Sequence, residues 1–222
     1  MIASRTAKTD AFLSRCRGVV HIGANTAQER GVYAARDLPV WWIEALPQAE
    51  DSLRANLAEY PKQRYAIALL TDRDGQEYDF GVSNNAGQSS SIFDLADHRK
   101  IWPTVGYLGS MRLRSTTFPN LVAREGVDLN LYDALVLDTQ GSELLVLQGM
   151  GELVRQFAWI KTEAADCNLY EGGCRLSDLD EYLNPYGFVQ VTRDIGGHHP
   201  DVGRVYDVLY RRLKNIISAQ GV

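Results

Sequence analysis

VVHIGANTAQERGVY, residues 19–33, leads from an apolar β-like segment through a turn of small residues into a helix-like segment. Thr26 and Glu29 have the spacing of a capping box, which predicts that a helix starts at the end of the turn, and Pro39 prevents its continuation. A strand followed by Gly23 and a capped helix directs backbone N–H groups at the carboxyl end of the strand, where open α/β sheets bind ligands. The turn is therefore a candidate ligand site.

Strand-like and helix-like segments alternate along the chain, with no internal repeat and no low-complexity tract. A β-branched and aromatic run at 40–45 precedes a helical pattern at 47–61, and similar pairs recur further on. This alternation predicts an α/β fold with a mostly parallel sheet covered by helices. The length favours a single domain over 1–222. The glycines and prolines of 84–126 predict an irregular insert or lid, with an extra strand within 111–118 as the alternative.

The composition is that of an ordinary globular protein, with 45% hydrophobic and 23% charged residues. A formal net charge of −5 disfavours nucleic acid and anionic membranes as partners, because both are bound through clustered Lys and Arg. Three cysteines without a metal-binding pattern suit a reduced compartment. The sequence shows neither a signal-peptide core nor a run of about 18 apolar residues. We therefore expect a cytoplasmic protein, of an oligomeric state that the sequence leaves open.

An acidic residue follows the turn at the distance that nucleoside sites use. Glu44 ends the second strand-like run, about 21 residues after Gly23, where a carboxylate can accept both hydroxyl protons of a ribose. The run Gly23–Gln28 lacks the second and third glycines that let a dinucleotide pyrophosphate approach the backbone. S-adenosylmethionine has the same adenosine without phosphate, and its sulfonium suits an acidic pocket. An NAD-dependent oxidoreductase and a non-catalytic nucleoside-binding module are the alternatives.

Five segments, in matching order over residues 18–212, resemble the FkbM-type S-adenosylmethionine-dependent methyltransferases. They are VVHIGANTAQE, VWWIEALPQAEDSLRANL, SNNAGQSSS, LRSTTF and LVLDTQGSELLVLQGM. The resemblance implies a class I methyltransferase (Rossmann-like) fold, a mostly parallel seven-stranded sheet with helices on both faces, and O-methylation of a sugar, glycoside or natural product. It places Gly23 and Asn25 in the methionine-side turn, Glu44 at the ribose and Asp138 in the acidic motif of the fourth core strand. Gln140 departs from the family, which often has Glu there.

Methyl transfer to oxygen requires an aligned acceptor hydroxyl that loses its proton at or near the transition state. In the expected fold the strand ends share one face, so Asp138, Glu163 and the loop with His198 can supply the base. Asp138 is the favoured base, because its apolar strand gives way there to a glycine-containing turn; the alternative is a helix N-cap. These carboxylates could instead hold Mg²⁺ through oxygen, but no tight D-x-D cluster favours a metal site.

Two further residues are candidates for the cofactor shell. His21 lies beside the turn, with a hydrogen-bonded structural role as its alternative, and Ser90 lies in a serine-rich loop that could equally be a surface turn. The acceptor is expected to be a small molecule or glycan. Its contacts should come from 84–126 and from the carboxyl-terminal loop.

Overall fold

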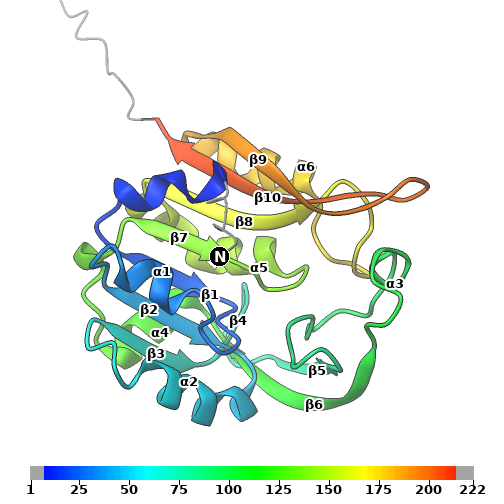
Figure 1. Cartoon of the computed structure of the whole chain (residues 1–222), viewed down its shortest axis with the longest axis horizontal. Coiled ribbons are helices and arrows are strands. Elements are labelled where there is room, and N and C mark those ends of the chain that lie inside the picture. The colour runs from blue at the N-terminus through cyan, green and yellow to red at the C-terminus, as the bar shows by residue number, and fades with distance from the viewer. Residues whose placement is uncertain (1–7, 214–222) are drawn as a thin grey trace, which may run out of the picture.

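The computed structural model describes residues 8–213, and its main element is a seven-stranded sheet (Figure 1). The strands are β1 Val19–Ile22, β2 Val40–Glu44, β3 Gln63–Ile67, β7 Ala134–Leu137, β8 Trp159–Ala165, β9 Phe188–His199 and β10 Gly203–Arg212. Their order is β3-β2-β1-β7-β8-β10-β9, and every neighbouring pair is parallel except the two that β10 makes. The sequence-based prediction of a mostly parallel seven-stranded sheet is confirmed.

Helices cover both faces of this sheet, because its central strands are apolar on both sides. Trp41 and Trp42 are fully buried on opposite faces, as the alternation along a strand requires. One face packs against η1 Lys8–Ser14, α1 Arg30–Ala34, η2 Pro47–Ala49 and α2 Glu50–Leu57. The other packs against α4 Phe118–Glu125, α5 Glu143–Met150, η4 Gly151–Gln156 and α6 Leu176–Leu183. The remaining short 3₁₀ helices are η3 Leu129–Leu131 and η5 Asn184–Tyr186.

A second sheet of three strands lies beside the carboxyl ends of the main sheet (Figure 1). Its order is β4-β6-β5, with bounds β4 Leu69–Leu70, β5 Glu77–Ser83 and β6 Tyr107–Thr116. β6 is the extra strand considered for 111–118. Regular structure therefore occupies much of 84–126, and the irregular part is 84–106, which holds only the short helix α3 His98–Ile101.

One local expectation is wrong. The capping box of Thr26 and Glu29 does not form: α1 starts only at Arg30, and its N-cap Glu29 makes no side-chain cap bond. Residues 24–29 instead form turns in which Asn25 and Ala27 have positive φ. The segment 195–204 is the end of a long β9–β10 hairpin that continues beyond the sheet, with strand pairing as far as His199 and Gly203 (Figure 1).

The close packing of α5 gives a test of this architecture. A Cβ added at Gly149 would lie 2.1 Å from the carbonyl oxygen of Thr71, whereas a Cβ at the helical Gly31 would meet nothing within 4 Å. We expect Gly149→Ala to lower the free energy of unfolding by about 1–3 kcal/mol through overpacking. Gly31→Ala should raise it by about 0.4–1 kcal/mol. Urea unfolding of both variants checks this; equal stability of the two would contradict the packing described.

Candidate active site

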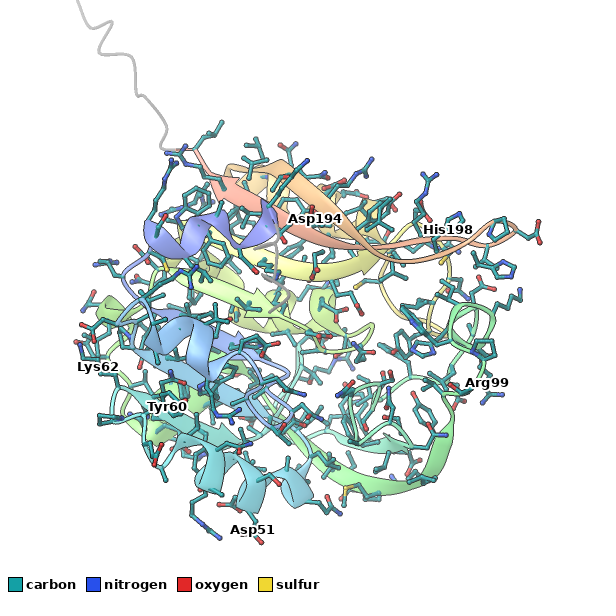
Figure 2. The ribbon with its side chains drawn as sticks, in the orientation of Figure 1. Asp51, Tyr60, Lys62, Arg99, Asp194 and His198 are labelled. Atoms are coloured by element: carbon teal, nitrogen blue, oxygen red, sulfur yellow. The ribbon has the colours of Figure 1, made fainter. Side chains whose placement is uncertain are left out.

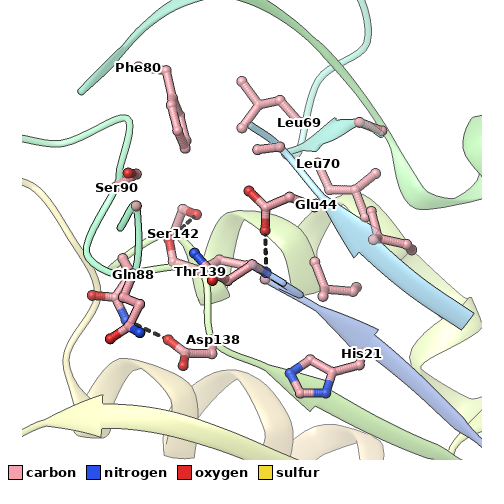
Figure 3. Close-up of a pocket in the computed structure, with 18 of the residues that line it drawn as sticks. His21, Glu44, Leu69, Leu70, Phe80, Gln88, Ser90, Asp138, Thr139 and Ser142 are labelled. Carbon is pink, nitrogen blue, oxygen red and sulfur yellow. Dashed lines mark hydrogen bonds between the residues drawn. The ribbon is translucent and has the colours of Figure 1, made fainter. Parts of the chain in front are cut away.

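A cavity of about 360 Å³ opens at the carboxyl ends of β1, β2 and β7 (Figure 3). Its floor is the turn after β1 and its far wall is the loop 83–91, which Figure 3 shows with Gln88 and Ser90 facing Asp138 and Glu44 from the opposite side. Leu69, Leu70 and Phe80 supply an apolar wall. Strand ends of an open α/β sheet are the expected place for a ligand.

Gly23 adopts φ +89° and lies directly against the chain after β7. A Cβ there would be 1.8 Å from the carbonyl oxygen of Asp138. Glycine adopts this φ without steric cost. The contact adds a requirement that the sequence did not show, because any side chain at this position would displace Asp138 as well as block the cavity.

The turn uses its own N–H groups to bind β2. Gly23 and Ala24 donate to the carbonyl oxygen of Ile43 at 2.9 and 3.1 Å, and Asn25 donates to Glu44 Oε2 at 2.7 Å. The donors that would hold a pyrophosphate are therefore occupied, and the N-terminus of α1 does not point at the turn from within it, because this helix starts only at Arg30. This geometry disfavours a dinucleotide.

Glu44 is buried, with 8% of its surface exposed, and lines the cavity. Its carboxylate accepts from the N–H of Asn25 and, at 2.8 Å, from the N–H of Leu46. Burial raises the pKa of Glu44, and these backbone hydrogen bonds oppose the rise. A carboxylate offers about four acceptor positions, so two remain for hydroxyl groups of a ligand.

Asp138 and Glu163 come together through Gln140. The Gln140 amide donates to Asp138 Oδ1 and, at 3.2 Å, to Glu163 Oε2, while its own Oε1 accepts from the hydroxyl of Tyr170. The Asp138 side chain is open to solvent, yet desolvation by the surrounding protein raises its pKa to about 7, against the lowering effect of the Gln140 hydrogen bond. Burial and the nearby Asp138 raise the pKa of Glu163 well above its usual range.

Glu143 is a functional residue that sequence reasoning missed. It is buried at the start of α5, and its carboxylate accepts from the N–H of Thr139 at 2.7 Å and from the N–H of Gly141 at 3.0 Å. These bonds fix the loop that carries Asp138 and Gln140. Only its place in the first turn of a predicted helix, where carboxylates are favourable, could have suggested it. Asp138 itself is not the N-cap, which is Ser142.

Of the other predicted site residues, His21 and Ser90 line the cavity and His198 does not. His21 lines the cavity but is buried, with Nδ1 3.1 Å from the Tyr33 hydroxyl and its ring stacked on Trp42, and burial lowers its pKa to about 3. Ser90 lines the cavity and accepts from the N–H of Ser83 at 3.0 Å. His198 is exposed on the long hairpin (Figure 2) and lines none of the cavities around Asp138.

Within residues 8–213, no three or more His, Cys, Asp or Glu side chains are grouped as a metal ion would require. Over the same range, every helix is too short or too polar to cross a membrane.

Comparison with known proteins identifies the family. Residues 21–189 match the methyltransferase FkbM domain. The chain belongs to this family. It is 26% identical over 205 residues to the 2-O-methyltransferase NoeI of Sinorhizobium fredii (strain NBRC 101917 / NGR234), covering 88% of this chain and 79% of the relative. The predicted family is confirmed, and the chain is an S-adenosylmethionine-dependent methyltransferase.

Solved structures agree on the fold. Sp1610 of Streptococcus pneumoniae, a candidate tRNA (m1A22) methyltransferase crystallised with S-adenosyl-L-methionine, superposes with a TM-score of 0.52 at 11% identity, over 96% of this chain and 75% of that one. A protein from Listeria monocytogenes serotype 4b gives 0.51 at 8% identity, over 96% and 69%. The class I methyltransferase fold is confirmed. The cavity suits S-adenosylmethionine, since it offers a buried carboxylate, an apolar wall and no Lys or Arg among its lining residues.

The role of Glu143 is testable. In Glu143→Ala the N–H groups of Thr139 and Gly141 lose their acceptor, which should lower the free energy of unfolding by about 1–3 kcal/mol. Binding of S-adenosylhomocysteine should weaken too, because the loop lines the cavity. Urea unfolding and calorimetry measure the two effects. Glu152→Ala, which removes an exposed carboxylate from the neighbouring η4, is the control, and equal stability of the two variants would refute the role.

Proposed function

We propose that this enzyme transfers the methyl group of S-adenosylmethionine to a hydroxyl oxygen of a sugar, glycoside or other small natural product. The observation that carries the proposal is the place of Asp138, an exposed carboxyl that lines the S-adenosylmethionine cavity and is held by the Gln140 amide. The surrounding protein raises its pKa to about 7. Such a group accepts a proton efficiently at neutral pH. The name of the relative NoeI, a 2-O-methyltransferase, supports the same reaction class.

Each end of S-adenosylmethionine has a matching group in the cavity. We assign the ribose diol to the free acceptor positions of Glu44, and the adenine to the apolar wall of Leu69, Leu70 and Phe80. The methionine portion would lie along the turn from Gly23 to Asn25, towards Asp138. The acidic lining attracts the sulfonium, whose bound methyl group is the electrophile of the reaction.

Asp138 then serves the chemical step. The acceptor oxygen bonds to the methyl carbon while the carbon–sulfur bond breaks and its electron pair stays on sulfur. The hydroxyl proton passes to the Asp138 carboxylate, which Gln140 holds in place. A small-molecule or glycan acceptor fits this site better than nucleic acid, because neither Lys nor Arg lines the cavity.

Loss of Glu44 should weaken the cofactor site specifically at the ribose. Removing charge-assisted hydrogen bonds costs about 1.5–3 kcal/mol, so Glu44→Ala should lower affinity for S-adenosylhomocysteine roughly tenfold or more. Calorimetry with the 2′,3′-dideoxy analogue of S-adenosylhomocysteine separates a lost ribose contact from a loosened turn. The parent should bind S-adenosylhomocysteine more tightly than the dideoxy analogue, and Glu44→Ala should bind both equally. Glu50→Ala, an exposed carboxylate on α2, serves as control. Unchanged affinity in a folded Glu44→Ala protein would remove the ribose assignment.

The role of Asp138 predicts a pH dependence. A base must be deprotonated, so single-turnover rates of the parent should rise with pH through about 7 and then level off. Asp138→Asn should abolish that rise and slow turnover by about 10²- to 10⁴-fold, with affinity for S-adenosylhomocysteine within a few-fold of the parent. A chelator should change neither protein. Lost cofactor binding with intact chemistry at saturation would instead place Asp138 in the cofactor shell.

A further inference from the structure

A second cavity, of about 320 Å³, adjoins the first on the far side of Asp138. The two cavities share Gln88, Asp138 and Gln140 as walls, so a group bound in the second is next to the methionine end of the first. The remaining walls come from the irregular segment 84–106 and from Glu163. The second cavity is therefore a space from which an acceptor can reach the proposed base.

His98 is the unusual residue of this second cavity. Only 2% of its surface is exposed, and its Nδ1 is buried without a hydrogen-bond partner among the described residues. The ring packs between Trp102 and Tyr170, with centroids 4.7 and 5.4 Å away. A buried polar atom without a partner carries a free-energy cost, which a ligand in the cavity can remove.

The charge of the imidazole follows from its surroundings. Burial lowers the pKa of His98 to about 4, so the ring is neutral at physiological pH. A neutral imidazole has one donor and one acceptor nitrogen, which suits a hydroxyl group, itself both donor and acceptor.

The rest of the lining sets the charge of the ligand. Asn85, Gln88 and Ser89 offer uncharged polar groups, and Trp102 and Val105 offer apolar surface. The ionisable groups are Asp138, Glu163 and the neutral His98, and no Lys or Arg lines the cavity. A carboxylate or phosphate on the ligand would lie beside two acidic groups with no cation to offset it. Hydroxyl groups on an uncharged ring meet matching partners.

We propose that this second cavity is the methyl-acceptor site, that it takes an uncharged polyhydroxylated ring such as a neutral sugar, and that His98 binds one of its hydroxyl groups. The assignment rests on the proposed O-methyl transfer and names where the acceptor binds and what it excludes. His98 contacts the acceptor and not S-adenosylmethionine, because it lines the second cavity and not the first.

The test combines a matched pair of acceptors with a matched pair of variants. Methyl β-D-glucopyranoside and methyl β-D-glucuronide differ by one carboxylate, and product formation is followed by mass spectrometry. We expect the parent to prefer the neutral glycoside at least tenfold in kcat/KM. His98→Phe should raise KM for it at least tenfold with affinity for S-adenosylhomocysteine within twofold, and His98→Asn, which keeps a hydrogen-bonding group, should recover part of the loss. His199→Phe, the same change on the exposed hairpin, should match the parent.

Saturation-transfer NMR on the protein loaded with S-adenosylhomocysteine measures glycoside binding without turnover. If the parent binds the glycoside and His98→Phe does not, but the parent transfers no methyl group, the acceptor site is supported and only the proposed function is refuted. Three results would overturn the acceptor-site assignment: neither binding nor transfer of the glycosides, an unchanged KM in a folded His98→Phe protein, or equal use of the glucuronide. Preferential methylation of an RNA oligonucleotide would overturn it as well.

Discussion

The active site depends on how closely the chain passes between Gly23 and Asp138. With no side chain at position 23, the end of β1 lies against the Asp138 carbonyl, at a distance where a Cβ would be 1.8 Å from the oxygen. The next residues of the turn are hydrogen-bonded to Ile43 and Glu44 at the end of β2. The contact of Gly23 with Asp138 and the hydrogen bond of Asn25 to Glu44 thus hold the ends of β1, β7 and β2 together. The proposed ribose ligand and the proposed base are consequently held at a fixed separation by backbone rather than by flexible side chains.

The electrostatics of the site follow from placing acids beside two cavities, the proposed cofactor site and the proposed acceptor site, that no Lys or Arg lines. Glu143 raises the pKa of Asp138, and Asp138 and Glu143 both raise the pKa of Glu163, while desolvation within the fold raises the pKa of all three. Because the folded state binds these protons more tightly than the unfolded state, the three groups favour folding at low pH and disfavour it as pH rises through their folded-state pKa values. A bound cation offsets part of the free-energy cost of keeping these carboxylates ionised in the folded state. The site thus suits a sulfonium ligand.

The sequence predicted those features that depend on local pattern, and missed those that depend on where distant segments meet. The alternation of strands and helices and the place of Glu44 at the end of β2 followed from short runs of residues. The capping box failed because tertiary hydrogen bonds to β2 hold the turn in another conformation. His98 lies in a segment without periodicity and reaches the site only because this segment pairs with the loop after β8, where the N–H of His98 donates to the carbonyl oxygen of Leu169. His198 lies away from it because the hairpin extends past the sheet.

Gln140, a departure from the family pattern, has a physical explanation in this network. A Glu at position 140 would add a fourth carboxyl to Asp138, Glu143 and Glu163. It could accept from the hydroxyl of Tyr170, but it would remove the amide that donates to Asp138 and Glu163. The amide instead donates to both Asp138 and Glu163 and lowers the pKa of each against the effect of desolvation. At neutral pH this hydrogen bonding keeps a larger fraction of Asp138 deprotonated. The residue that breaks the family pattern is therefore the one that makes the proposed base available.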